Sequence, residues 1–337
     1  MIIALILACT QSNEPPKSSD PQQNISPVEK VDTTLVIYSG RGEALVDELL
    51  KQAATELELE IEVQYGSTSD LVTRLLTEGD QSPADVIFAQ DSGHLGALAQ
   101  QKRLQPLSTE ILSVVPPHFQ DENGLWVGTS GRLRTLVYDS SQLNEDQLPQ
   151  SLKELSEPKW KGMLGWAPSN SSFQAHVSAL RHLWGEEETK TWLEGVQSNA
   201  PAVYPKNSPQ VKAADAGQLK IGWVNHYYLH KLGKADSSAK NFSFPQKDAG
   251  NIVMLAGAGV TAHSTHKSNA ERLIGWLLSD NAQNWFAQNT FEYPTRPGIL
   301  THSDVPALNV EWLADVKQEH LSDIGPTRQL LQSLGIQ

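Results

Sequence analysis

Two adjacent tyrosines, Tyr227 and Tyr228, are the residues in this sequence whose type and position point most directly to chemistry. They follow an apolar segment, 220–224, and Asn225, so they lie where a strand gives way to a helix. Neighbouring side chains diverge by about 100° in mid-helix but can converge at a first turn. A phenol is neutral at pH 7, whereas a trivalent cation stabilises the phenolate, a hard oxygen donor that suits Fe(III). By spacing alone, aromatic packing is the more common explanation of such a pair.

Two histidines and an arginine lie near strand ends as well. His226 and His230 are four residues apart, but no third ligand accompanies them, so we expect them to be surface histidines. Ser130 and Arg132 follow a predicted strand and could hold an oxyanion, since the planar guanidinium of Arg132 matches carbonate or carboxylate. The loop 168–172 either holds the same anion or simply caps a helix, for which Ser and Asn are preferred.

Enzyme signatures are missing from the sequence. We find no Gly-x-Ser-x-Gly nucleophile elbow, no phosphate-binding Gly-x-x-x-x-Gly-Lys and no dinucleotide-binding Gly-x-Gly-x-x-Gly. A hydrolase with a cleft nucleophile such as Ser171 would lack any supporting motif. The sequence therefore favours a binding protein and not an enzyme.

The elements that would position these residues alternate between strand and helix patterns. The segments 35–38, 61–65 and 85–89 are typical of strands, and helical spacing of apolar residues separates them. Further strands are expected at 133–138, 163–166, 220–224 and 252–261, and helices at 172–184, 187–196 and 269–288. This order predicts an α/β fold, in which ligands bind outside the carboxyl ends of strands.

Length, charge and cysteine content narrow the class of protein and its possible partners further. The 337 residues suit two lobes, and a net charge of −13 without any basic block argues against nucleic acid as a partner. The single cysteine, Cys9, directly follows the apolar segment 2–8, which resembles a bacterial lipoprotein signal. We therefore expect a signal at 1–9, lipidation of Cys9 and a flexible polar tether at 10–33.

Several segments together resemble the ferric-ion-binding protein family, which consists of class II periplasmic substrate-binding proteins of iron ABC importers. The matching segments, in the same order along the chain, are 37–41, 83–91, 126–132, 158–162, 206–208, 224–228 and 292–294. The resemblance covers about 35–300. It implies that Tyr227 and Tyr228 bind Fe(III), and that Arg132 and Ser130 hold a synergistic anion such as carbonate. Further anion contacts are implied for Asn170, Ser171, Ser172, Asn207 and Asn225.

This chain departs from the family pattern at three positions. Gly42 and Glu43 stand where many members have a histidine, Gln90 replaces a glutamate ligand, and Trp166 replaces a third tyrosine. Because neutral ligands are lost, Fe(III) needs negative donors, for which Glu43 is the preferred candidate and Asp91 a second.

The resemblance also implies the organisation and setting of the protein. We expect a two-lobed class II periplasmic-binding-protein fold with a hinge of crossing strands. Lobe one would comprise 34–131 and 258–305, and lobe two 132–257 and 306–337. The protein would be a monomer, membrane-anchored in the periplasm or at the cell surface, that delivers iron to an ABC permease. A binder of a small organic or inorganic anion on the same fold is the alternative.

Overall fold

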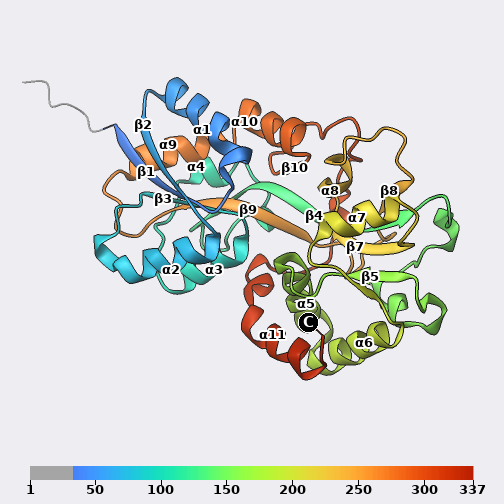
Figure 1. The fold of residues 1–337 in the computed structure, drawn as a ribbon. Coiled ribbons are helices and arrows are strands. Elements are labelled where there is room, and N and C mark those ends of the chain that lie inside the picture. The colour runs from blue at the N-terminus through green and yellow to red at the C-terminus, as the bar shows by residue number, and fades with distance from the viewer. Residues whose placement is uncertain (1–32, 337) are drawn as a thin grey trace, which may run out of the picture. The chain divides into compact units, whose positions relative to one another are not determined.

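The computed structural model describes residues 33–336 of the chain (Figure 1). The predicted signal at 1–9 with Cys9, and the predicted tether up to Asp32, lie outside the described residues. Within residues 33–336, no helix is both long enough and apolar enough to cross a membrane.

The strands of the described part form one mixed sheet. They are β1 (Thr34–Ser39), β2 (Glu60–Tyr65), β3 (Val86–Ala89), β4 (Val127–Asp139), β5 (Leu164–Trp166), β6 (Ala202–Val203), β7 (Ile221–Asn225), β8 (Ala239–Phe242), β9 (Val253–Val260) and β10 (Tyr293–Pro294). Eight of them run in the order β2-β1-β3-β9-β4-β7-β5-β6, while β8 and β10 pair with β4. The sheet is therefore continuous from β2 at one edge to β6 at the other.

Helices connect most of these strands, as the sequence predicts. They are α1 (Glu43–Leu57), α2 (Thr68–Glu78), α3 (Ser92–Gln100), α4 (Thr109–Leu112), α5 (Ser171–Trp184), α6 (Glu186–Ser198), α7 (Asn207–Asp215), α8 (Tyr227–His230), α9 (Lys267–Leu277), α10 (Asp280–Trp285) and α11 (Ile324–Ser333). The predicted α/β order is confirmed, with β1 pairing in parallel with both β2 and β3.

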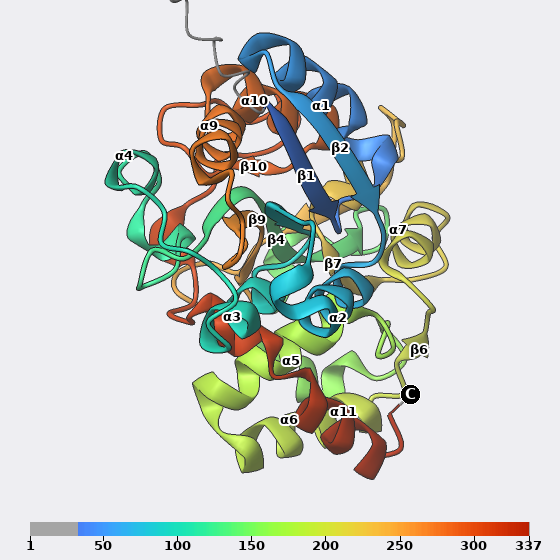
Figure 2. The same cartoon turned by 90° about the vertical axis from the view of Figure 1, so that its left-hand side faces the viewer.

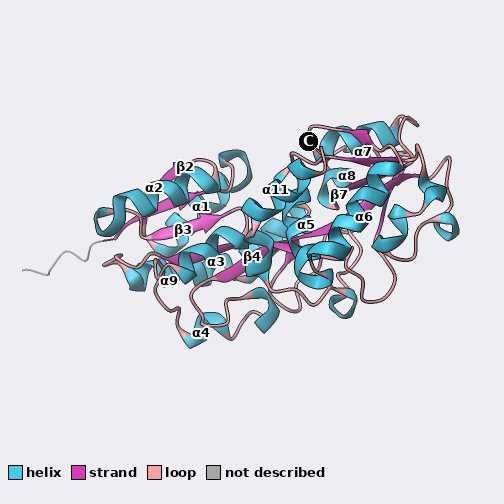
Figure 3. Ribbon diagram, turned by 90° about the horizontal axis from the view of Figure 1, so that it is seen from below, coloured by secondary structure: helices cyan, strands magenta, loops and turns pink. Residues whose placement is uncertain are grey.

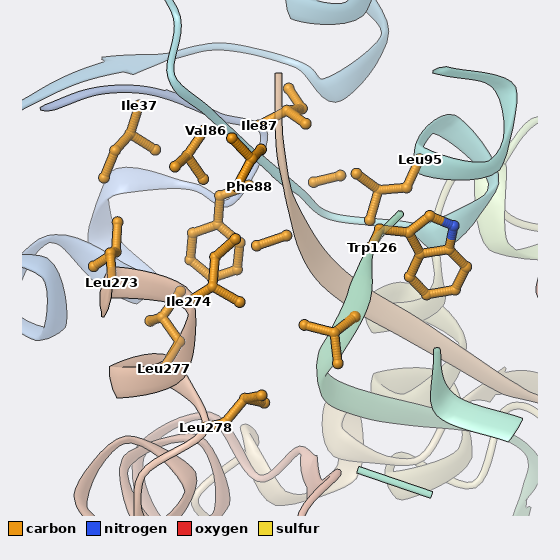
Figure 4. Close-up of a cluster of buried hydrophobic side chains, with 14 of the residues drawn as sticks. Ile37, Val86, Ile87, Phe88, Leu95, Trp126, Leu273, Ile274, Leu277 and Leu278 are labelled. Atoms are coloured by element: carbon orange, nitrogen blue, oxygen red, sulfur yellow. The ribbon is translucent and has the colours of Figure 1, made fainter. Parts of the chain in front are cut away.

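The first of two large apolar cores lies around β1, β3 and α9. Helices α1 and α9 cover one face of these strands, and α2 and α3 cover the other (Figure 1). Figure 4 shows Ile37 and Phe88 from the strands beside Leu273, Ile274 and Leu277 from α9, all fully buried. Spacing of three and four residues places these α9 side chains on one helix face, which is why this segment forms a helix over the sheet.

The predicted single helix over 269–288 is wrong in detail. The helix α9 ends at Leu277 and α10 begins at Asp280, followed by a π-helical turn, η6 (Phe286–Thr290). Ser279 causes the break, because its hydroxyl accepts a hydrogen bond from the backbone N–H of Ala282 at 3.3 Å and caps the second helix.

The long strand β4 joins the strands of the first core to the strands β7 and β8. Its first half, up to Leu133, pairs with β9, and its second half, from Arg134, pairs with β7 and β8. Figure 3 shows β4 between β3 and β7. Leu133 packs in the first core, whereas Leu136 packs in a second core with Phe173 and Trp223. Because successive side chains of a strand point to opposite faces, Arg132 and Arg134 share one face of β4 and Leu133 and Thr135 share the other.

The C-terminal segment contacts elements of both cores. The 3-10 helix η8 (Gln318–Ser322) packs against α3 and α5, as Figure 2 shows for the red segment beside α3. Its approach to α3 depends on a glycine, since a Cβ at Gly93 would lie 2.6 Å from the Cβ of Ser322. Ser92 also donates a hydrogen bond to Gln318 Oε1 at 2.7 Å.

Candidate functional site

The two tyrosines lie together at the first turn of α8, directly after β7. Their rings stack with centroids 4.2 Å apart and an interplanar angle of 29°. Tyr227 is buried and Tyr228 is half-buried. Burial, followed by the neighbouring Tyr228 phenol, raises the pKa of Tyr227 well above its ordinary value, while the charge of Arg132 opposes the rise. The phenol of Tyr227 is therefore neutral at pH 7 unless a cation replaces its proton.

His226, which precedes the pair, is a buried structural residue, so the prediction that it lies on the surface is wrong. Its Nδ1 accepts a hydrogen bond from the N–H of Leu133 at 3.1 Å, so its Nε2–H donates to the carbonyl of Phe291 at 2.7 Å. Burial lowers the pKa of His226 to about 4. With both ring nitrogens engaged inside the fold, His226 anchors the start of α8 to β4 and has no free nitrogen for a metal.

Two arginines on one face of β4 supply positive charge beside the tyrosines. Arg134 is fully buried, and it donates to Asn225 Oδ1 at 3.0 Å and to the carbonyl of Trp223 at 3.0 Å. Arg132 donates to the carbonyl of Gln90. Neither arginine forms an ion pair with a carboxylate of the described residues. A buried cation without an ion pair is costly, so this site is suited to receive negative charge.

The charge of Arg134 acts directly on the tyrosine pair. Burial lowers the pKa of Arg134, and the phenols of Tyr228 and Tyr227 oppose that change when they ionise. A guanidinium remains protonated at neutral pH despite such a shift. Phenolates at these two positions would therefore be stabilised by a neighbouring positive charge.

The predicted anion-contacting residues form one hydrogen-bonded network at the start of α5. Asn170 Oδ1 accepts from the backbone N–H of Ser172 at 3.0 Å and from its hydroxyl at 2.6 Å, which caps the helix. The amide of Asn207 donates to the same hydroxyl at 3.1 Å, and Arg134 donates to it at 3.3 Å. Through Arg134 the network extends to Asn225. The structure thus brings together five residues from four separate segments of the chain.

A cavity of about 330 Å³ opens beside this network, and we name it the arginine cavity after Arg132 and Arg328 in its wall. Ser171 and Ser172 line it from α5, and Gln90 and Asp91 line it from the end of β3. The cavity thus lies at the carboxyl end of a strand and the amino end of a helix, where backbone N–H groups favour anions.

The two candidate carboxylates lie in different settings. Asp91 is half-exposed in the arginine cavity, where it caps α3 and contacts His94 Nδ1 at 2.6 Å. Burial would raise the pKa of Asp91, but the hydrogen bond with His94 and the charge of Arg132 outweigh it, so this pKa is lowered. Glu43 is exposed at the start of α1, its charge acts on Lys51 and Tyr65, and it does not line the cavity. Its ligand role stays a prediction.

Ser130 belongs to a buried ion-pair network that the sequence analysis did not assign. Arg41 makes two hydrogen bonds to Glu292, of 3.1 and 2.9 Å, and Ser130 donates to the same carboxylate at 2.5 Å. All three residues are buried, and the charges of Arg41 and Arg132 help to lower the pKa of Glu292 against the effect of burial. The sequence offered one sign of this network, because Arg41 and Glu292 both lie in segments that resemble the ferric-ion-binding protein family. Arg134 carried no signal beyond a charge inside an apolar strand.

The donor set of this region limits which metals it suits. Within residues 33–336, no group of three or more His, Cys, Asp and Glu side chains is placed to hold a metal ion. A metal bound at this site would take its protein donors from the tyrosines and complete its shell with an anion or water. Hard oxygen donors of this kind suit Fe(III) better than Zn(II) or Cu(I).

Comparison with known proteins agrees with the fold. The family model "Bacterial extracellular solute-binding protein" matches residues 81–316, more than half of the chain. The chain is 34% identical over 276 residues to an Fe(3+)-binding periplasmic protein of Serratia marcescens, covering 80% of this chain and 81% of that protein. The chain therefore belongs to the bacterial extracellular solute-binding protein family.

Solved structures share the fold over nearly the whole described part. Iron-bound HitA from Pseudomonas aeruginosa aligns with a TM-score of 0.81 at 28% identity, covering 90% of this chain and 99% of HitA. A Trichodesmium protein (IdiA, FutA) in complex with iron and citrate aligns with a TM-score of 0.82 at 25% identity, covering 90% and 100% of the two chains.

These comparisons decide three of the expectations. The fold is the two-lobed periplasmic-binding-protein fold, as predicted, and the chain is a solute-binding protein and not an enzyme. Solute-binding proteins of this family work with ABC transporter permeases.

Proposed function

We propose that this protein binds Fe(III) through the phenolates of Tyr227 and Tyr228 and delivers it to the permease of an iron ABC importer. The stacked pair, 4.2 Å between ring centroids and directly after β7, is the observation that carries the proposal. Arg132 and Arg134 support it, because two positive charges next to the phenols lower the cost of ionising them. The relatives and structural neighbours named above, which bind iron, support the same ligand.

A synergistic anion, such as carbonate, completes the proposed site. We place it in the arginine cavity, against Arg132 and the amino end of α5 at Ser171 and Ser172. Charge supports this position, since Arg132, which lines the cavity, has no ion-pair partner within 4 Å among the described residues. Asn170, Asn207 and Asn225 would orient Ser172 and Arg134, and Ser130 would act through Glu292. Asp91 lines this cavity and Glu43 does not, so Asp91 is the better placed of the two candidate protein carboxylates.

A titration of metal-free protein with Fe(III), with and without carbonate, tests both proposals. Binding by phenolates should produce a charge-transfer band in the visible range, and carbonate should tighten the binding. Affinity should fall as the pH drops, because binding releases phenol protons. Iron binding without a visible band would contradict the role of the tyrosines.

The alternative function, binding of a small anion alone, uses the same cavity. The unpaired charges of Arg132 and Arg134 favour it, but an anion by itself has no need of the tyrosine pair. If carbonate or citrate binds with equal affinity in the presence and absence of Fe(III), the alternative replaces the iron proposal.

We also propose that the protein is a monomeric lipoprotein held at the membrane through Cys9, with the folded body in the periplasm or at the cell surface. The apolar segment before Cys9 and the polar segment after it support this. A Cys9→Ala variant should leave the membrane fraction. A variant that stays membrane-bound would contradict the anchor.

A further inference from the structure

A second and larger cavity lies against the other face of β4. It has a volume of about 560 Å³, and Leu133 and Thr135 of β4 line it. Arg132 and Arg134, which alternate with these residues along the strand, face the site described above. The two cavities therefore share one strand as a wall, and a ligand in one need not displace a ligand in the other.

The lining of this second cavity combines aromatic surface with negative charge. Phe242, Tyr293 and Trp312 contribute aromatic rings, and Trp312 is 40% exposed. Glu145 and Asp146 contribute carboxylates, and no lysine or arginine lines the cavity. We name it the carboxylate cavity. Its charge is opposite in sign to that of the arginine cavity, so the chemistry of its ligand must differ.

Asn241, a polar residue of the wall, is held in a fixed orientation. The side-chain amide of Asn241 donates from Nδ2 to the carbonyl of His226 at 2.8 Å, which fixes the orientation of the group. Its Oδ1 is buried and has no hydrogen-bond partner in the described structure. Because Oδ1 is not exposed to the cavity, Asn241 shapes the wall and does not itself contact a ligand.

We propose that the carboxylate cavity is a second ligand site, for a small organic amine that carries an aromatic ring. The ring packs against Phe242, Tyr293 and Trp312, and the ammonium lies toward Glu145 and Asp146. Cation–π attraction to the aromatic walls acts in the same direction as the carboxylates. This inference does not depend on iron binding, because none of these residues belongs to the proposed iron site.

Phenethylamine is a suitable probe, with phenylacetate as a matched compound that carries the opposite charge on the same ring. We expect metal-free protein to bind phenethylamine with a Kd below about 1 mM, which corresponds to roughly 0.5 kcal/mol per non-hydrogen atom. Phenylacetate should bind at least roughly tenfold more weakly, since Glu145 and Asp146 attract an ammonium and repel a carboxylate. Isothermal titration calorimetry measures both affinities.

Two variants and a control locate the binding. Ala307→Trp places a large side chain at an exposed position in the lining and should abolish binding of phenethylamine. Ala235→Trp makes the same change at an exposed position outside both cavities and should bind as the parent does. The double change Glu145→Gln and Asp146→Asn should reduce the preference over phenylacetate to about threefold or less. If phenethylamine at about 10 mM, tenfold above the expected upper limit of its Kd, shows no detectable binding, the proposed ligand class is overturned. If Ala307→Trp binds phenethylamine as the parent does, the proposed site is overturned.

Discussion

The two faces of β4 differ in how they treat charge. On the face of Ser130, Arg132 and Arg134, charged groups are buried and held by networks of hydrogen bonds. On the face of Leu133 and Thr135, the wall is apolar or neutral, and carboxylates occur only farther out, at Glu145 and Asp146. Strict alternation along a strand can thus separate the proposed anion site from the proposed amine site, although the residues that line them are adjacent in sequence.

We call the face of β4 with Ser130, Arg132 and Arg134 the arginine face. The largest expected effect tests the buried ion pair of Arg41 and Glu292, which Ser130 of this face contacts. Arg41→Met leaves the buried carboxylate of Glu292 without its ion-pair partner, and we expect the free energy of unfolding to fall by about 3–5 kcal/mol. Urea denaturation measures this change.

The matched control for Arg41 is Lys51→Met, which removes an exposed partner of Asp47 four residues away. It should cost about 0.5 kcal/mol or less. Equal losses in the two variants would contradict the conclusion that the arginine face depends on buried charge.

The next largest effect concerns the tyrosines. Tyr227→Phe and Tyr228→Phe each remove one oxygen and keep the ring stacking, so each should weaken Fe(III) binding by about 100-fold or more, since even outer contacts of a metal ligand change affinity 10–100-fold. The double variant should lose the visible band. Absorption during iron titration provides both measurements.

Fold stability separates the metal role of the tyrosines from a packing role. Neither tyrosine oxygen takes part in a hydrogen bond to another element of the described structure, so thermal unfolding of the metal-free variants should change little. Variants that bind iron normally would instead support aromatic packing as the only role of the pair.

The smallest effect is a pH dependence that arises from His176, which packs behind Arg134. Burial, and then the charge of Arg134, hold the pKa of His176 well below its ordinary value, while Nε2–H donates to the carbonyl of Ala249 at 2.7 Å. The unfolded chain takes up a proton near pH 6.5 and the folded chain does not. Stability from this group is therefore present above about pH 6.5 and is lost as the pH falls toward the lower folded pKa, by at most about 1.4 kcal/mol per pH unit.

His176→Gln should flatten this slope between pH 6.5 and 5, whatever its effect on stability at pH 7. Denaturant unfolding at several pH values measures it, and parallel slopes for the parent and His176→Gln would contradict the assignment.

The sequence by itself determined the α/β order, the strand before Tyr227 and the family resemblance, because these depend on apolar periodicity and on short segments whose residues are adjacent in the chain. It also determined that Tyr227 and Tyr228 follow a strand. Even the misjudged helix over 269–288 was correct in its apolar face, and only the capping hydroxyl of Ser279 changed its length.

Only the tertiary structure decided which buried charged and polar groups meet. Arg41 and Glu292 are 251 residues apart and Arg134 and Asn225 are 91 apart, and no local pattern records such pairs. His226 looked like a surface residue because its two partners, Leu133 and Phe291, come from other parts of the chain. Both cavities of β4 arise in the same way, since a strand carries its alternation in its sequence, but what packs against each face is decided when the chain folds.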